Sequence, residues 1–233
     1  IALANRKLLD VRDKRTQPGR DEKILTSWNA LAIRAFVHAA NVFDQDAWLD
    51  TAIRCADFIA ISLRKTDGML RSWMDGQARH QACLDDYSYL AAANLDLWQA
   101  TGTSRFLETA YALADEILSE FPDQEHGGFF LTSIRHEVLV DRSKSFIDGS
   151  LPSGNAVAAE VLQRLGRFTG EHRYIEAAQK TLEAHGLPME KQPFGTAAMI
   201  NVLEDQLQAP REVVIVGKRD ETRELRRVAF AHP

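Results

Sequence analysis

The chain has 233 residues and a formal net charge of −5, from 28 Lys and Arg against 33 Asp and Glu. Hydrophobic residues make up 45% of it and charged residues 26%, as in an ordinary globular protein. A mildly acidic chain lacks the basic excess that a phosphate backbone requires, so we expect no nucleic-acid partner. No apolar run approaches the roughly 18 residues that cross a bilayer, and no signal peptide is visible, which predicts a cytoplasmic protein with no membrane partner.

The first residues, "IALANRKLLDVRDKR", have the pattern of a helix already under way and do not begin with Met. We therefore expect a fragment of a longer protein. Two cysteines, Cys55 and Cys83, fit neither a zinc spacing nor a Cys-x-x-Cys motif. They predict two reduced thiols that pack between helices.

A pattern of helix, short loop and helix then occurs three times, which indicates an internal repeat. The three units span residues 27–59, 85–118 and 152–185. They align without a gap when Ala52, Ala110 and Ala178 are superposed, at offsets of 58 and 68 residues. Each second helix then carries an aromatic residue at the same place: Trp48, Phe106 and Tyr174.

The two helices of each unit differ in composition. The first helices are rich in small residues, as in "YLAAANL" and "AVAAEVL", so they can be crowded on both sides as an inner layer would be. The second helices carry more charge and can face water. Longer loops join the units at residues 65–84, 122–151 and 188–193. In the middle loop, the alternation in "GGFFLTSIRHEVLV" predicts a short β-hairpin.

After a fourth first helix, "FGTAAMINVLEDQL", the pattern changes to a compact strand, "REVVIVG", and a helix, "DETRELRRVAF". A strand and a helix with no return form an unfinished unit, so we expect truncation here as well. We divide the chain into a helical region over residues 1–208 and the start of a small α/β element over residues 209–233.

Long helical hairpins with small-residue inner helices and long connecting loops favour a mainly α fold. We expect part of an α/α toroid, with a short β-hairpin in a long loop and a small C-terminal strand-helix piece. An open α-solenoid such as a tetratricopeptide array is the structural alternative. Its units are about 34 residues long with little connecting loop, which does not match this chain.

The residues that open the first helices vary between units although the helices repeat. In a toroid these openings meet at one mouth of the barrel, where their side chains would line a shared cavity. The candidates are Trp28, Asn29, Asp85, Asp86, Tyr87, Ser153 and Asn155. Amides and carboxylates bond hydroxyl groups and an indole stacks on a sugar face, so we expect a small carbohydrate-like ligand. Helix capping and packing are the alternative explanation.

A glycosidase needs two carboxyl groups across the scissile bond, one of them kept protonated. The best pair combines Asp86 or Asp85 with Asp148, which lies in "FIDGSLPSGN" just before the third unit. We assign the catalytic roles to Asp86 and Asp148. We also expect Asp85 and Asp86 to divide their work, one capping the helix and the other facing the cavity. Asp148 can equally form an Asp-Gly turn.

An epimerase instead needs bases on opposite faces of a sugar, commonly two histidines. His126 and His136 lie in the middle long loop, but no histidine opens a first helix, which counts against this chemistry. No His-Glu-x-x-His spacing and no Gly-rich phosphate loop occurs, so we expect neither a metal nor a cofactor.

Four further residues of the middle loop are candidates for binding. Lys144 and Arg142 suit an anionic group such as a uronate or a sugar phosphate, or they belong to a solvated basic loop. Phe129 and Phe130 offer a stacking platform over the cavity, or they anchor the hairpin.

Four stretches carry a family resemblance: "RDEKILTSWNALAIRAF", "LDDYSYL", "GGFFLTSIRHEVLVDRSKSFIDGSLPSGNAVAA" and "EVVIVG". With them the chain resembles the C-terminal region of the thioredoxin-like, spermatogenesis-associated family. The resemblance implies a six-hairpin toroid similar to those of N-acylglucosamine 2-epimerases, cellobiose epimerases and several glycosidases. It also implies a thioredoxin-like domain in the intact parent chain, which this sequence lacks.

These observations lead to two expectations about function. The first is a carbohydrate-binding or carbohydrate-modifying domain, with hydrolase-like or epimerase-like chemistry. The second is a non-catalytic scaffold or protein-interaction module that supports the thioredoxin-like domain.

Overall fold

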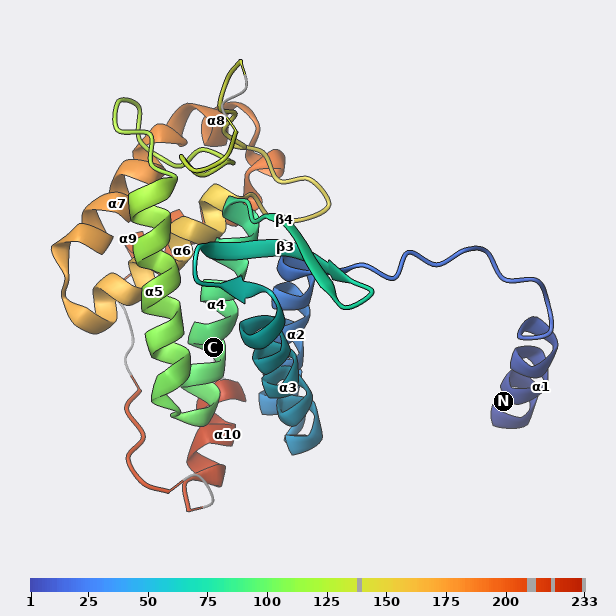
Figure 1. Ribbon diagram of the computed structural model, residues 1–233. Coiled ribbons are helices and arrows are strands. Elements are labelled where there is room, and N and C mark those ends of the chain that lie inside the picture. The colour runs from blue at the N-terminus through green and yellow to red at the C-terminus, as the bar shows by residue number, and fades with distance from the viewer. Residues whose placement is uncertain (138–139, 209–212, 219–220, 232–233) are drawn as a thin grey trace.

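The computed structural model describes residues 1–137, 140–208, 213–218 and 221–231 (Figure 1). It is mainly helical, and each predicted unit forms two neighbouring helices, which confirms the expected fold class. The first helices are α2 (Thr26–Phe43), α4 (Leu84–Thr101) and α6 (Gly154–Thr169). The second helices are α3 (Asp46–Ser62), α5 (Ser104–Glu120) and α7 (His172–Ala184).

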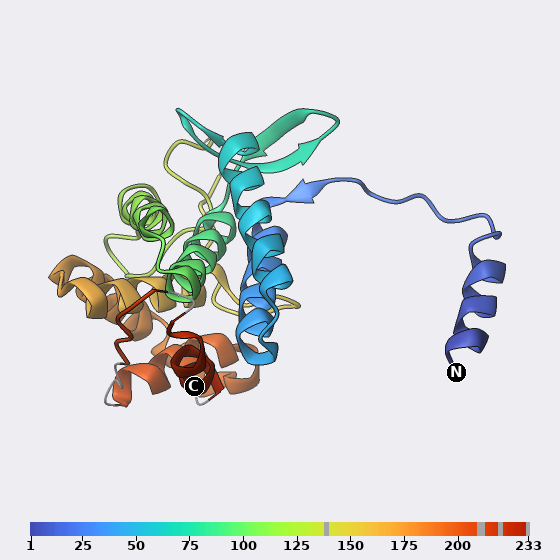
Figure 2. The ribbon, with the colours of Figure 1, turned by 90° about the horizontal axis from the view of Figure 1, so that it is seen from below.

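The first helices form the expected inner layer. α2 packs against α4, α4 against α6, and α6 against the fourth first helix, α9 (Ala197–Leu207). The four helices thus follow one another in a curved row, and α3, α5 and α7 each pack on the helix before them (Figure 2).

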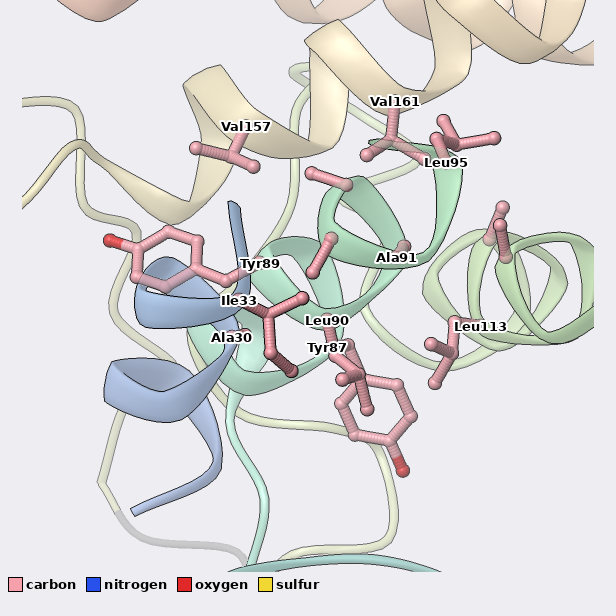
Figure 3. Packing of buried hydrophobic residues seen from close by; sticks show 14 of the residues in the cluster. Ala30, Ile33, Tyr87, Tyr89, Leu90, Ala91, Leu95, Leu113, Val157 and Val161 are labelled. Carbon is pink, nitrogen blue, oxygen red and sulfur yellow. The ribbon is translucent and has the colours of Figure 1, made fainter. Parts of the chain in front are cut away.

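Burial along the helices follows these two layers. In α4, 14 of 18 residues are buried, because neighbouring helices cover it on several sides. Its small residues Ala91, Ala92 and Ala93 permit that close approach. Figure 3 shows Ile33 of α2 and Val161 of α6 pointing into the same core from either side of α4.

The first long loop differs from the expectation, because most of it forms a small antiparallel sheet. Strands β2 (Arg64–Lys65), β3 (Gly68–Met74) and β4 (Gln77–Gln81) follow one another, and β3 also pairs with β1 (Ile24–Leu25). Asp75 and Gly76, at φ 52° and 77°, connect β3 to β4. A two-residue hairpin turn needs two such left-handed residues, and Asp-Gly supplies them readily. The short hairpin therefore lies in this loop and not in the middle one.

The middle loop has no named strand in its described residues; its one β-bridge joins Pro122 to Phe129. Residues 138 and 139 of the predicted hairpin lie outside the described part. Side chains fix this loop instead. Asn155 Oδ1 accepts a hydrogen bond from Phe129 N at 2.7 Å, and Asn155 Nδ2 donates to Phe129 O at 2.9 Å and Ser145 O at 3.2 Å.

The remaining helices lie at the two ends of the chain. A short helix, α8 (Gly186–Lys191), and a 3-10 turn, η1 (Pro193–Gly195), replace the third loop. The predicted C-terminal helix forms as α10 (Arg223–Ala231) and packs on α2. Residues 211 and 212 of the predicted strand lie outside the described part, and residues 213–217 carry no strand. α1 (Ala2–Arg12) is exposed along its length and stands apart (Figure 1).

A network of charges joins the inner helices. Asp96 of α4 is 6% exposed and binds Arg34 of α2 and Arg164 of α6, both at 2.8 Å. Arg34 also binds Glu160 of α6 at 2.6 Å. Burial alone would raise the pKa of Asp96, but these two guanidinium groups and His38 outweigh it, so this pKa lies far below its usual range.

None of the helices in the described ranges combines the length and the apolar character that crossing a bilayer requires.

We predict that Asp96→Asn lowers the free energy of unfolding at pH 7 by about 3 kcal/mol, because two half-buried guanidinium groups lose their shared carboxylate. A carboxyl whose folded pKa is depressed stabilises the fold above its unfolded pKa, and this contribution is lost as the pH falls. The difference from the unsubstituted chain should therefore shrink below about pH 4. Denaturant titrations at pH 7 and pH 3 test this. Asp57→Asn, at the ion pair with Arg105 whose side chains are 39% and 51% exposed, is the control and should change little.

We also predict that Asn155→Ala lowers the free energy of unfolding by about 3 kcal/mol, because the buried amide and carbonyl of Phe129 lose their partner. Hydrogen exchange should accelerate at the Phe129 amide before it does in α4. Asn201→Ala, on the exposed face of α9, is the control and should stay within about 0.5 kcal/mol of the unsubstituted chain. An unchanged Phe129 amide would contradict the anchoring role.

Candidate functional site

The openings of the inner helices meet at one end of the row, as expected for a toroid. Ser27 N, in the first turn of α2, donates to Asp86 Oδ1 in the first turn of α4 at 3.0 Å. Gly154, the first residue of α6, lies directly against the carboxylate of Asp85. These contacts bring the starts of α2, α4 and α6 together at one end of the row, and we call this group of helix starts the mouth.

Asp86 is the centre of this mouth but is closed to a ligand. It is fully buried, and its Oδ2 accepts hydrogen bonds from Cys83 N and from Arg71 Nη1, both at 3.0 Å. Together with Ser27 these partners cap α4, hold the start of α2 and tie both to strand β3. The proton-transfer role that we expected for Asp86 is therefore not supported, because its oxygens already have partners and no solvent access.

Asp85 has the environment that we had expected for the residue facing the cavity. Its side chain is half-buried, and its carboxylate accepts no hydrogen bond within the described part of the chain. Burial raises the pKa of Asp85, the neighbouring Asp86 raises it further, and Arg71 lowers it in part. A half-buried carboxyl that stays protonated to a higher pH than usual is suited to general acid catalysis.

Arg71 is a site residue that the sequence analysis missed. It lies on β3, inside the stretch expected to be a loop, and its side chain is 36% exposed beside Asp86. The Asp-Gly turn signal at residues 75 and 76 would have revealed this strand and, with it, a side chain directed at the helix openings.

Trp28 remains available to a ligand. It follows Ser27 in the first turn of α2, and 62% of it is exposed. An exposed indole that follows Ser27, whose backbone amide binds Asp86, can stack on the apolar face of a sugar ring.

Asn29 and Tyr87 occupy equivalent positions but serve packing. Asn29 Nδ2 donates to Leu25 O at 2.8 Å, and Asn29 Oδ1 accepts from the Cys55 thiol at 3.5 Å. The Tyr87 ring packs on Phe121, and its hydroxyl accepts from a backbone amide of β3. These contacts favour packing roles for both residues over the ligand contact that we expected.

The residues at the start of α6 also serve to hold the fold together. Ser153 Oγ accepts from Ala156 N at 3.1 Å as a helix cap, and Asn155 is fully buried against the middle loop. Asp148 Oδ1 accepts from Ser153 N and Asp148 Oδ2 from Ala198 N, both at 2.8 Å. Asp148 thus ties the starts of α6 and α9 together, and both of its carboxylate oxygens have backbone partners. The expected ligand and catalytic roles of these three residues are not supported.

The aromatic and basic residues of the middle loop hold the loop together. Phe129 is buried in the core, and the guanidinium of Arg142 lies 4.3 Å from the centre of the Phe130 ring. Lys144 Nζ binds Asp123 at 2.6 Å and donates to Gly127 O at 3.0 Å. None of the four side chains is therefore held in the ligand-binding arrangement that we expected.

The histidines give no pair of bases at the mouth. His126 is exposed beside Asp123, and His136 Nδ1 accepts from Ser133 N within its own turn. His185 is fully buried under the middle loop, and burial lowers its pKa. Among the described residues, no group of three or more His, Cys, Asp or Glu side chains is placed to hold a metal ion.

Three comparisons place these features among known proteins. No protein-family model matches the chain. It is 30% identical to human spermatogenesis-associated protein 20 over 224 residues, which cover 91% of this chain and 28% of that protein. It is 27% identical to an uncharacterised protein of Caenorhabditis elegans over 218 residues, covering 90% of this chain and 30% of that protein. The chain thus spans less than a third of the length of these relatives.

Solved structures share the arrangement of helices at low sequence identity. A GH76 α-mannanase of Bacteroides thetaiotaomicron matches 93% of this chain and 58% of its own, with a TM-score of 0.64 at 12% identity. A cellobiose 2-epimerase of Bacillus thermoamylovorans matches 72% of this chain and 45% of its own, with a TM-score of 0.59 at 13% identity. The chain is therefore a homologue of spermatogenesis-associated protein 20 over most of its length, and it has part of the α/α toroid fold of six-hairpin glycosidases and sugar epimerases.

Proposed function

We propose that the mouth formed by α2, α4 and α6 binds a carbohydrate and that Asp85 transfers a proton during its conversion. The observation that carries the proposal is the carboxyl of Asp85, which is half-buried, lacks a hydrogen-bond partner in the described part of the chain and has a raised pKa. The sugar enzymes among the structural neighbours support the substrate class by analogy of fold alone.

The proposed roles follow from the positions of three side chains. Trp28 stacks on the sugar ring, and Arg71 donates hydrogen bonds from the part of its guanidinium that Asp86 does not use. Asp85 donates its proton to a sugar oxygen or accepts one from a carbon or hydroxyl. A hydrolase requires a second carboxyl group. Since Asp86 and Asp148 are occupied, hydrolysis would need one from another part of the protein.

A non-catalytic scaffold is the second candidate. The observation that favours it is the number of polar side chains at the openings that serve structure, namely Asn29, Asp86, Asp148, Ser153 and Asn155. In this reading the toroid supports the thioredoxin-like domain that the family resemblance implies.

We predict that Asp85→Asn abolishes turnover but leaves stability within about 0.5 kcal/mol, whereas Asp86→Asn lowers stability by about 3 kcal/mol. A thermal-shift screen of the full-length protein with mono- and disaccharides, acidic sugars and sugar phosphates first identifies a ligand. A saturable shift should then appear, of about 2.7 kcal/mol at 100 times the dissociation constant. No shift across the panel would favour the scaffold, and full activity of Asp85→Asn would remove the catalytic assignment.

The pH profile gives a further prediction. If protonated Asp85 is the acid, kcat/KM falls as the pH rises through its raised pKa, because the carboxylate has no proton to give. Removing the positive charge by Arg71→Gln should raise this pKa and move the falling limb to higher pH. A limb that stays in place would show that Asp85 is not the titrating group.

Gly154→Ala tests the placement of Asp85. A Cβ at this position would overlap Asp85 Oδ1, so the carboxyl must move, while α6 itself accepts alanine readily. We expect kcat/KM to fall about a hundredfold. Stability should fall as well, because the added Cβ would also lie 3.3 Å from Asp85 N and from Leu84 Cδ2. Gly149→Ala is the matched control, because nothing lies within 4 Å of its added methyl group. Equal activity of the two variants would contradict the placement.

A further inference from the structure

A cavity of about 310 Å³ lies at the end of the helix row opposite the mouth. Its walls come from α3, from the loop that joins α4 to α5, and from α10, which lies at this end of the molecule (Figure 1). The volume is at the lower end of the range of roughly 300–1,000 Å³ that small-molecule sites occupy. We call it the α10 cavity.

The first wall is one face of α3. Asp46, Leu49, Asp50 and Ile53 line the cavity, and their spacing of three, four and seven residues places them on the same side of the helix. Leu49 is 4% exposed and Ile53 is partly buried, so the two form an apolar floor. The carboxylate of Asp50 has neither a hydrogen bond nor an ion pair within the described ranges. This wall therefore offers negative charge beside apolar surface.

The opposite wall is positively charged. Arg223 and Arg226 of α10 line the cavity and, three residues apart, share a helix face. Arg223 Nε donates to Asp44 Oδ1 at 3.0 Å, which fixes α10 at this end of the row. The distance from Arg223 Nη2 to Asp46 Oδ2 is 3.7 Å, longer than a hydrogen bond. Guanidinium groups thus face carboxylates across the cavity without closing it.

The repeat explains why this place is open. At an offset of 58 residues Ile53 corresponds to Tyr111, and at 68 residues Thr103, in the loop that lines the cavity, corresponds to Glu171. The Tyr111 ring packs on Tyr174 at 6.3 Å between ring centres. Burial and the neighbouring carboxylate of Glu171 raise the pKa of Tyr111. In the second unit a ring therefore takes the place that the shorter Ile53 leaves open in the first.

The lining selects for a ligand that carries both signs of charge. A simple anion would be attracted by the arginines but repelled by Asp46 and Asp50, and a simple cation would meet the reverse. A molecule with an ammonium and a carboxylate group close together finds a partner for each. The apolar floor adds a place for an apolar substituent between them.

We propose that the α10 cavity binds a free α-amino acid with an apolar side chain. Its carboxylate lies between Arg223 and Arg226, its ammonium group binds Asp50, and its side chain packs on Leu49 and Ile53. The cavity is at the far end of the row from the mouth, so the proposal holds whether or not the mouth binds a sugar.

Calorimetric titration of the full-length protein with L-leucine tests the ligand class. L-Leucinamide lacks the carboxylate, and 4-methylpentanoate lacks the ammonium group. We expect saturable binding of L-leucine and at least about tenfold weaker binding of each analogue, because each loses one charge-assisted contact.

Three variants test the place of binding. Ile53→Tyr introduces the residue of the equivalent position 111 and fills the cavity, whereas Ile61→Tyr makes the same change at a site on α3 that is 78% exposed. We expect the first to weaken L-leucine binding at least about tenfold and the second to leave it unchanged. Asp50→Asn should also weaken L-leucine about tenfold but leave 4-methylpentanoate unaffected, since that analogue has no ammonium group.

Three outcomes would overturn the proposal. The first is the absence of saturable binding of L-leucine, L-valine and L-phenylalanine at millimolar concentration. The second is equal affinity for L-leucine in Ile53→Tyr and Ile61→Tyr, which would place any binding elsewhere in the protein. The third is 4-methylpentanoate binding as tightly as L-leucine, which would indicate an anion site. If Ile53→Tyr lowers the thermal midpoint, Asp50→Asn at the exposed edge of α3 decides the place of binding.

Discussion

The buried carboxylate of Asp86 is the interaction on which the mouth depends. It joins three segments that lie far apart in the sequence: the start of α2, the start of α4 and strand β3. Each oxygen accepts hydrogen bonds from groups that would otherwise be orphaned, two of them amides at helix starts. Such a carboxylate is costly to bury alone but stable when fully paired. By occupying the cap, Asp86 leaves its neighbour Asp85 without a structural task.

The need to pair buried polar groups at helix starts also explains why the first residues of α2, α4 and α6 have different roles. Position 28 and its two equivalents are occupied by Trp28, Asp86 and Gly154. Trp28 is exposed, Asp86 is buried and paired with Arg71, and Gly154 packs against the carboxylate of Asp85. A repeat keeps its helices because their packing is shared, but each opening meets a different neighbour. One equivalent position has therefore acquired three physical roles.

Much of the fold could be predicted from the sequence, because helix periodicity and the repeat offsets depend on local patterns. The inner and outer layers followed from small residues in α4 and charges in the second helices. The site was harder. Asn155, Asp148 and Tyr87 have the right chemistry for a ligand. Their partners, however, are backbone groups of the middle loop, the start of α9 and strand β3, which spacing does not reveal. Arg71 was missed because its strand was taken for a loop.

The small sheet that carries Arg71 ends in β4, an open edge whose backbone groups could pair with a strand from another molecule. Arg79 and His80 are exposed on this edge, and His80 adopts a left-handed φ of 61°, which interrupts regular pairing. Charge and a local kink are the usual protection of edge strands against aggregation. The sheet that positions Arg71 therefore also creates an exposed edge strand. Arg79 and His80 protect this edge against pairing with a strand of another molecule.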